Sequence, residues 1–306
     1  MGWADRLAKA VFGSIPSAAP IEAVAPFEAD FVVVDVETAC SRVSSICQIG
    51  IVAFRHGAPT LEFETLIDPR DEFDDFNISI HGITDRHVRD RPHFGALHSV
   101  VEGYLSGRVT VAHSSFDRRA LSAACLKHGR SDISTRWVDS VQMARRAWPD
   151  LGSHKLNLLT RHLGIPHTHH DALSDARAAG MVVVRALEVT GLSLDELAAP
   201  VARQPRSSGP VARQGGAEGP LTDQCIVMTG DFTVPKSAMA DLIAAAGGAV
   251  TSTVSRKTTM LVLGVQDSTT FAGKDKSAKH LKAEELAAAG QLLRIVTEVE
   301  LRTMIG

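Results

Sequence analysis

A segment rich in proline and glycine divides this 306-residue chain, and it limits the possible fold more than any other feature. Residues 200–220 read PVARQPRSSGPVARQGGAEGP, in which the pentapeptide PVARQ occurs twice. Such a composition buries too little apolar surface to offset the entropy lost on ordering, and it is typical of a linker. The sequence therefore predicts two domains, each long enough to bury a core. The predicted divisions are a tail at 1–28, a first domain at 29–197, a linker at 198–220 and a second domain at 221–306.

Charge and cysteine content narrow the functional classes. The net charge of −3 argues against a protein that coats nucleic acid through general positive charge. Six of the nine lysines follow residue 221, whereas twelve of the thirteen histidines lie between His56 and His170. This asymmetry suggests that the two domains have different roles. The four cysteines show no CxxC spacing, so neither a zinc ribbon nor a redox pair is indicated.

The first domain is expected to be α/β with a mixed sheet, because three consecutive strands precede an alternation of helices and strands. The three strands are joined by short turns, which favours a meander. Asp171 is expected to cap the last helix and Gly191 to end it. The expected strands are 31–38, 46–54, 60–68, 109–114 and 136–141, and the expected helices are 94–107, 116–129, 155–165 and 171–191.

Two acidic residues close the first expected strand, FVVVDVET. Side chains two apart on a strand face the same side, so Asp35 and Glu37 should project together. Such a pair on its own also fits a solvated strand end. However, Asp117 at the start of one helix and Asp175 one turn into another could converge on the same place. A divalent cation would relieve the repulsion, and oxygen ligands favour Mg²⁺ or Mn²⁺ over zinc.

The segments that hold these acids resemble the three motifs of the DEDDh, or DnaQ-like, exonucleases. They are VVVDVETA, VAHSSFDRRAL and HHDALSDA. The stretch IHGITD at 80–85 also resembles a loop that this family carries between its first two motifs. The resemblance covers about residues 29–190. It implies an RNase H-like fold and a 3′→5′ exonuclease that depends on two divalent ions.

The resemblance implies a role for each of five residues. Asp35, Glu37 and Asp175 would hold one ion, and Asp35 and Asp117 the second, which stabilises the departing 3′ oxygen. The family pattern HxAxxDA begins here at His170, the expected general base. Its unperturbed pKa of about 6.5 lets imidazole accept a proton near neutrality. The products would be nucleoside 5′-monophosphates.

His167 and His169 precede the expected base in the run HTHH, and in principle they could be zinc ligands. No cysteine is nearby, and neighbouring side chains on an irregular loop are expected to diverge. We therefore expect these two histidines at the surface or close to a phosphate, and not in a metal site.

The resemblance also implicates residues in a pocket for the terminal nucleotide. Thr38 would meet the terminal sugar, and His81 and Phe116 would line the pocket, although each also fits core or loop packing. Two positions depart from the family pattern: Cys40 replaces a glycine, and Ser114 stands where asparagine is common. Neither change removes a ligand, but both leave the substrate preference open.

The second domain is expected to be a small α/β domain of order βαββαβα with a mostly parallel sheet. The segments VMTGDF, AAAGGAV, TTMLVLG and SAKHLKAEELAAAG resemble a BRCT domain of the type found in bacterial DNA ligases and the large subunit of replication factor C. The resemblance implies a phosphate site at Thr229, Gly230 and Lys279, with Lys236 matching a basic residue of the DNA-end-binding type. A hydroxyl, an amide and cations suit an anion, although a solvated helix face fits them as well. The ligand would be a DNA 5′ phosphate or a phosphoprotein.

Taken together, these features predict a two-metal 3′→5′ exonuclease acting on DNA in repair or replication, tethered to a BRCT domain. One alternative is an RNA exonuclease similar to RNase T or oligoribonuclease. Another is an adaptor in which the BRCT domain is functional and the nuclease fold is vestigial. No apolar run approaches the roughly 20 residues of a membrane span. A cytoplasmic protein, nucleoid-associated if bacterial, is therefore expected.

Overall fold

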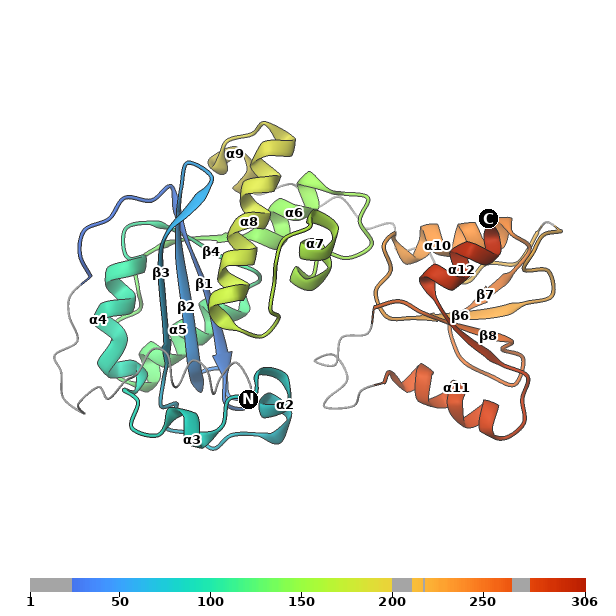
Figure 1. Cartoon of the computed structure of the whole chain (residues 1–306), viewed down its shortest axis with the longest axis horizontal. Coiled ribbons are helices and arrows are strands. Elements are labelled where there is room, and N and C mark those ends of the chain that lie inside the picture. Colours follow the sequence, from blue (N-terminus) through green and yellow to red (C-terminus); the bar gives the residue numbers. More distant parts are fainter. Residues whose placement is uncertain (1–23, 200–210, 217, 266–275) are drawn as a thin grey trace. The chain divides into compact units, whose positions relative to one another are not determined.

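The computed structural model describes residues 24–199, 211–216, 218–265 and 276–306, which form two compact units (Figure 1). Residues 1–23 of the expected tail and residues 200–210 and 217 of the expected linker lie outside the described residues. The predicted domain limits therefore stay predictions, and each unit is described by itself. In the part of the chain that the structure describes, no helix is long and apolar enough to span a membrane.

The first unit contains a five-stranded sheet of order β3-β2-β1-β4-β5. The first three strands pair antiparallel, as a meander requires, and β4 and β5 pair parallel to β1 and to each other. The mixed sheet predicted from the sequence is thereby confirmed. The strands are β1 (Phe31–Thr38), β2 (Ile46–Arg55), β3 (Ala58–Leu66), β4 (Val109–Ala112) and β5 (Arg136–Asp139).

The long helices of this unit were predicted, and several short ones were not. The segment 136–141 was expected to be a strand throughout, but the strand ends at Asp139, whose side chain accepts a hydrogen bond from the Val141 amide and starts a helix. The helices are α2 (Asp75–His81), α3 (Asp85–Val88), α4 (Phe94–Leu105), α5 (Phe116–Lys127), α6 (Ser140–Ala147), α7 (Leu156–Leu163), α8 (Ala172–Thr190) and α9 (Leu194–Ala198).

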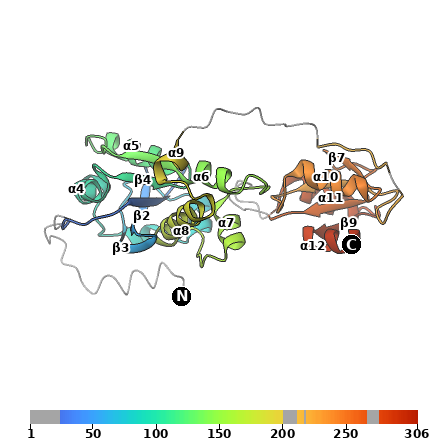
Figure 2. The same ribbon diagram turned by 90° about the horizontal axis from the view of Figure 1, so that it is seen from above.

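The two faces of the sheet carry different layers (Figure 2). Val32, Val34 and Val36 of β1 pack with the buried side chains of α4 and α5 in one apolar cluster. Because side chains alternate along a strand, Asp35 and Glu37 point to the opposite face. That face is covered by α8, which packs on β1, β2 and β3.

A glycine on β2 lets the start of α8 approach the sheet closely. Gly50 pairs with Asp35 in the antiparallel register. A Cβ atom at this position would lie 2.4 Å from the backbone carbonyl carbon and oxygen of Ala172 and from the amide nitrogen of Leu173. Only a residue without a side chain fits such an approach. The first turn of α8 therefore lies directly beside the acidic end of β1.

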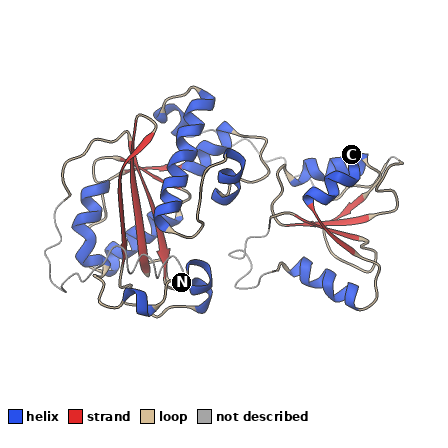
Figure 3. Cartoon of the chain, in the orientation of Figure 1, coloured by secondary structure: helices blue, strands red, loops and turns tan. Residues whose placement is uncertain are grey.

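The second unit has a parallel sheet of order β7-β6-β8-β9 with helices on both faces (Figure 3). Apolar residues of α10 and α12 pack on one face, and Ala283 of α11 packs on the other. The order βαββαβα expected from the sequence is present. The elements are β6 (Cys225–Thr229), α10 (Lys236–Ala245), β7 (Ala249–Thr251), β8 (Met260–Leu263), α11 (Ala278–Ala288), β9 (Arg294–Thr297) and α12 (Glu298–Ile305).

Candidate active site

The end of β1 and the start of α5 bring the first three acidic residues together. Asp35 and Glu37 lie on the face of β1 that α8 covers. Asp117 is in the first turn of α5, which follows β4, the parallel neighbour of β1, and it is only 4% exposed. Its Oδ1 accepts a hydrogen bond of 3.2 Å from the backbone N–H of Val36. This contact fixes the Asp117 carboxylate beside the residue that separates the other two acids.

Asp175 is the fourth acid, and it comes from the first turn of α8. The helix begins after Asp171, whose side chain accepts a hydrogen bond of 2.9 Å from the Ser174 amide. Asp175 Oδ1 accepts a hydrogen bond from His167 Nε2 and lies 3.6 Å from His169 Nδ1. Desolvation alone would raise the pKa of Asp175, but these two histidines lower it below its usual value.

Burial and the repulsion between neighbouring carboxylates raise the pKa values of Asp35 and Asp117. Burial raises the pKa of Asp35 well above its usual value, and the nearby carboxylates of Asp117, Asp175 and Glu37 raise it further. Burial also raises the pKa of Asp117 to about 7. Carboxylates in such surroundings tend to hold protons unless a cation lies close by. A set of carboxylate oxygens with this deficit of positive charge fits divalent ions such as Mg²⁺ or Mn²⁺.

His170 lies beside this acidic cluster in an unusual backbone conformation. Its φ of 64° is in the left-handed region, which costs a non-glycine residue roughly 1 kcal/mol. The His170 N–H donates to Asp175 Oδ2 at 3.0 Å, which helps to hold this conformation. The ring Nδ1 lies 3.8 Å from Oε1 of Glu37, so that contact is electrostatic and not a hydrogen bond. Glu37, His170 and Asp175 each offer a ligand atom within 4.8 Å of the other two.

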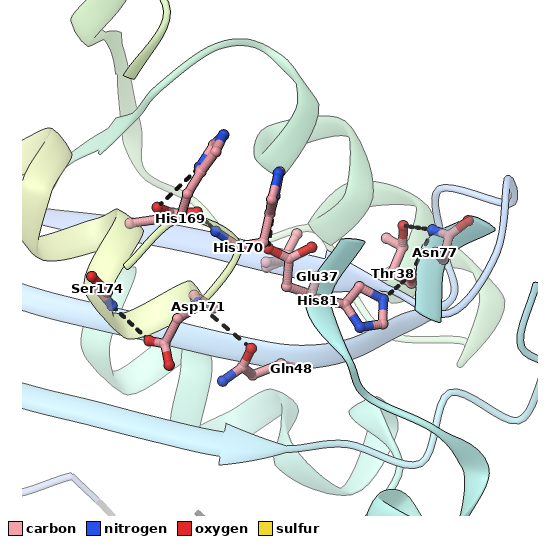
Figure 4. Close-up of polar contacts among 12 residues, drawn as sticks. Glu37, Thr38, Gln48, Asn77, His81, His169, His170, Asp171 and Ser174 are labelled. Carbon is pink, nitrogen blue, oxygen red and sulfur yellow. Dashed lines mark hydrogen bonds and ion pairs between the residues drawn. The ribbon is translucent and has the colours of Figure 1, made fainter. Parts of the chain in front are cut away.

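Two positions were expected for His167 and His169, at the surface or close to a phosphate, and the surface position does not fit His167, whose side chain is only 6% exposed. Its Nδ1 lies 3.2 Å from Oγ1 of Thr160 on α7, while its Nε2 reaches Asp175. His169 is 35% exposed, and its ring stacks on that of His170 with 3.7 Å between centroids (Figure 4). The two side chains do not diverge: their ring centroids are 5.2 Å apart, and both rings approach Asp175.

Thr38, at the end of β1, is held by two side chains from α2 (Figure 4). His81 Nδ1 accepts from the Ile83 amide at 3.0 Å, so the proton is on Nε2, which donates to the Thr38 carbonyl at 3.1 Å. Asn77 Nδ2 donates to the same carbonyl at 2.7 Å. His81 is 2% exposed, and burial lowers its pKa. The sequence reading missed Asn77, although its spacing of four from His81 puts both on one helix face.

Gln48 is a second residue that the sequence reading missed. It lies on β2 directly opposite Glu37, and its side chain is fully buried. Its Nε2 donates to Glu64 Oε1 on β3 at 2.6 Å, and its Oε1 accepts from the Ala172 amide at 3.3 Å. Gln48 therefore links the sheet to the first residue of α8. The signal that could have identified Gln48 is its place as a polar residue within the otherwise apolar run ICQIGIVAF.

The remaining residues of the predicted nucleotide pocket have ordinary structural contacts. Phe116 is partly buried and packs against the apolar cluster under α4 and α5. Ser114 Oγ accepts from the Phe116 amide at 3.1 Å. Cys40 is buried, and its amide donates to Ser45 Oγ at 3.2 Å. A role for Thr38, His81 and Phe116 in holding a nucleotide stays a prediction.

In the second unit, the residues of the predicted phosphate site gather near the end of β6. Thr229 Oγ1 donates to the side chain of Ser277, the N-cap of α11, at 2.9 Å. Lys279 Nζ donates to the Met228 carbonyl at 3.2 Å. Desolvation and then the charge of Lys236 lower the pKa of Lys279. Gly230 has a φ of 87°, a conformation that glycine adopts readily.

The first unit is similar in sequence to known exonucleases. The model of the exonuclease family matches residues 32–183. A PolC-type DNA polymerase III of Oceanobacillus iheyensis is 32% identical over 161 residues, which are 51% of this chain and 11% of that protein. The Streptococcus suis PolC-type polymerase is 31% identical over 180 residues, which are 58% of this chain and 12% of that protein. The chain thus spans only about a ninth of the length of these relatives.

Solved structures with a similar fold include exonucleases. Exonuclease X in complex with 5′-overhanging duplex DNA is 23% identical, with a TM-score of 0.46 over 55% of this chain and 97% of that one. The nuclease domain of 3′hExo, a DEDDh family member bound to rAMP, is 19% identical, with a TM-score of 0.47 over 52% of this chain and 91% of that one. The family match spans β1 through most of α8. It includes the four acids and the expected base, which are Asp35, Glu37, Asp117, Asp175 and His170. Residues 32–183 therefore match the exonuclease family in sequence.

Proposed function

We propose that the chain is a 3′→5′ exonuclease that removes nucleoside 5′-monophosphates from DNA ends with the help of two divalent ions, Mg²⁺ or Mn²⁺. The observation that carries this proposal is the convergence of Asp35, Glu37, Asp117 and Asp175 on one face of β1, with His170 beside them. The PolC-type relatives favour DNA over RNA as the substrate. A role in repair or replication is part of the same proposal.

The carboxylates supply the ligands for the ions. Asp35, Glu37 and Asp175 would hold one ion, and Asp35 with Asp117 the other. When bound, such ions polarise the scissile phosphate and stabilise charge on the attacking and departing oxygens. The raised pKa values of Asp35 and Asp117 support this assignment, since burial, and then the neighbouring carboxylates, disfavour their charged forms, and a bound cation would offset that cost.

His170 is the proposed general base. Its Nδ1 lies 3.8 Å from Glu37 Oε1, and we assign to Nε2 the proton of the attacking water. The backbone hydrogen bond from His170 to Asp175 ties the base to a metal ligand. The first turn of α8 therefore holds His170 and Asp175 at a fixed separation. In the proposed in-line reaction, the 3′ oxygen would leave from the side of the phosphorus opposite the attacking water.

The second unit is proposed to be a BRCT domain that brings the nuclease to DNA ends or to phosphorylated partners. The proposal rests on the contacts of Thr229 and Lys279 with the start of α11 and the end of β6, and on the nearby charge of Lys236. Tethering would raise the local concentration of substrate without any new catalytic contact.

The test is digestion of oligonucleotides labelled at either end, DNA and RNA side by side, with Mg²⁺ or Mn²⁺. Wild type should shorten DNA stepwise from the 3′ end. His170→Ala should lower the rate by about 10²–10⁴-fold, the usual contribution of a general base. The matched control is His162→Ala, which removes an exposed histidine of the nearby helix α7 and should leave the rate unchanged.

The other outcomes separate the alternatives. Shortening of RNA alone would keep the chemistry and overturn the DNA assignment. Release of label from the 5′ end would overturn the polarity. Folded, metal-loaded protein that digests neither substrate would contradict the nuclease proposal and favour an adaptor that acts through its second unit.

A further inference from the structure

We propose that His167, His169 and Asp175 form a binding site for a late first-row transition ion, with Zn²⁺ as the best match, next to the carboxylate cluster. The three residues each offer a ligand atom within 4.8 Å of the other two. This site uses two imidazoles and one carboxylate, whereas the proposed catalytic ions use carboxylates. It is therefore a different site with a different metal preference.

The distances fit a small tetrahedral ion. Zinc binds histidine nitrogen and carboxylate oxygen at about 2.0–2.2 Å, which puts neighbouring ligand atoms about 3.4 Å apart. His169 Nδ1 and Asp175 Oδ1 are already 3.6 Å apart. His167 Nε2 is hydrogen-bonded to the same oxygen, so that contact has to lengthen to admit an ion. A rotation of the His167 or Asp175 side chain would have to provide this.

A second contact fixes the orientation of the His167 ring for binding an ion. Its Nδ1 lies 3.2 Å from Oγ1 of Thr160, which is itself buried and lies 3.2 Å from the Asn157 carbonyl. A histidine that binds metal through one nitrogen normally donates its other N–H to an oxygen, which fixes the ring and the tautomer. Thr160 is placed to accept that hydrogen bond. His167 is also almost fully buried, so little side-chain entropy remains to be lost when an ion binds.

The loop between α7 and α8 is held in the shape that brings the ligands together. The Thr168 amide donates to Ser174 Oγ at 2.8 Å, and the His170 amide donates to Asp175 Oδ2 at 3.0 Å. Both anchors lie in the first turn of α8, which also carries Asp175. The two oxygens of this carboxylate therefore face different partners, with Oδ1 toward His167 and His169 and Oδ2 toward the backbone of His170.

The ligand chemistry selects the ion. Mg²⁺ prefers six oxygen ligands in near-octahedral geometry and gains little from imidazole. Zn²⁺, Cu²⁺, Ni²⁺ and Co²⁺ bind imidazole well, in the affinity order of the divalent series. Because Asp175 belongs to both sets of ligands, a zinc ion on Oδ1 would compete with the ion proposed for catalysis. This consequence rests on the proposed function, whereas the existence of the site does not.

The test is a titration of the metal-free full chain with Co²⁺, whose visible absorption reports four-coordinate binding without any need for activity. Wild type should give the absorption of one four-coordinate Co²⁺ per chain, in addition to any ions that the carboxylates hold, and Zn²⁺ should displace it. His167→Gln and His169→Gln should each weaken Co²⁺ binding by at least about tenfold. His162→Gln, an exposed histidine of α7, is the matched control and should bind like wild type. Asp35→Asn should also keep the absorption, because it alters only the carboxylate cluster.

The opposite pattern would overturn the site. If Asp35→Asn abolishes Co²⁺ binding while both histidine variants retain it, the ion lies among the carboxylates. If wild type binds no Co²⁺, His167 only positions Asp175 through a hydrogen bond. Unfolding curves of the metal-free variants exclude misfolding, and His169→Gln, at the more exposed residue, tests the site should His167→Gln not fold.

Activity adds a separate readout. If the chain is an Mg²⁺-dependent nuclease, Zn²⁺ should inhibit it at concentrations far below those of Mg²⁺, and His169→Gln should need about tenfold more Zn²⁺ for the same fractional inhibition. Each variant is compared with itself, with and without Zn²⁺. A chain that binds Co²⁺ as described yet digests no oligonucleotide would refute the proposed function and leave the metal site intact.

Discussion

Glu64 should make the stability of the first unit depend on pH near neutrality. It lies half-buried on β3, and its Oε1 accepts the hydrogen bond from Gln48. Burial, and then the charge of Asp171, raise its pKa from 4.5 to about 7. Between pH 4.5 and about pH 7, Glu64 holds a proton in the folded protein that it has released in the unfolded chain. Its contribution to stability is therefore complete below about pH 4.5 and is lost as the pH rises through 7.

The magnitude follows from the shift. A difference of about 2.5 pKa units at 1.36 kcal/mol per unit gives about 3 kcal/mol. Glu64 remains partly accessible to water, and screening reduces this figure to about 1.5 kcal/mol. With a urea m-value of about 2 kcal/mol/M, the unfolding midpoint should fall by roughly 0.7 M between pH 5 and pH 8 because of this residue.

The substitution that isolates the effect is Glu64→Gln. Glutamine keeps an acceptor for Gln48 but cannot ionise, so the difference in midpoint between wild type and variant should change by about 0.7 M across this range. Urea unfolding of metal-free protein is followed by tryptophan fluorescence. The three tryptophans are Trp3, Trp137 and Trp148, so all precede the predicted linker and the signal reports on the N-terminal part of the chain.

An exposed glutamate away from Glu64 is the control. Glu188→Gln removes a carboxylate of α8 that pairs with Arg185 at the surface, and it should keep the pH dependence of wild type. Other buried acids titrate in both proteins, so their effects cancel in the comparison. If Glu64→Gln and wild type lose stability in parallel from pH 5 to pH 8, burial does not control the ionisation of Glu64, and the reasoning fails.

Two further substitutions test how α8 is attached to the sheet. Gly50→Ala places a methyl group 2.4 Å from the Ala172 backbone, so it should destabilise the first unit by about 3 kcal/mol or more; an unfolding midpoint equal to that of wild type would contradict this close approach. Gln48→Leu leaves the Ala172 amide and Glu64 without their hydrogen-bond partner, which should cost about 2–3 kcal/mol. If Gln48 positions the first turn of α8, kcat should also fall more than KM rises, and unchanged kcat would show that it only stabilises the fold.

The parts of the fold that the sequence predicted are those set by local periodicity. The strand FVVVDVET and the long helix after Asp171 were predicted nearly to the residue, because alternation and capping are properties of neighbouring residues. The same alternation predicted that Asp35 and Glu37 share a face. That Asp117 and Asp175 could reach this face came from their places at the starts of two helices and from the resemblance, and the structure brings all four acids together.

The parts that could not be predicted depend on contacts between distant segments. Gln48 reaches Glu64 only in the particular register of β2 and β3, and no local pattern fixes that register. The loop that brings His167 to Asp175 contains a left-handed residue, His170, and no local pattern predicted that conformation at this position. The side chains of the HTHH run were expected to diverge on an irregular loop, whereas His167 and His169 both approach Asp175.

The first turn of α8 connects the sheet to the proposed base and to a proposed metal ligand. Asp171 starts the helix, Gly50 allows it to lie on β2, and Gln48 holds its first amide. Asp175 then faces β1 from the same turn, and its carboxylate holds the backbone of His170. A shift of this turn would therefore move the proposed base and a proposed metal ligand together. It follows that substitutions at Gly50 or Gln48, which touch neither reacting group, should impair the base and the metal site in proportion, whereas substitution of His170 should impair the base alone.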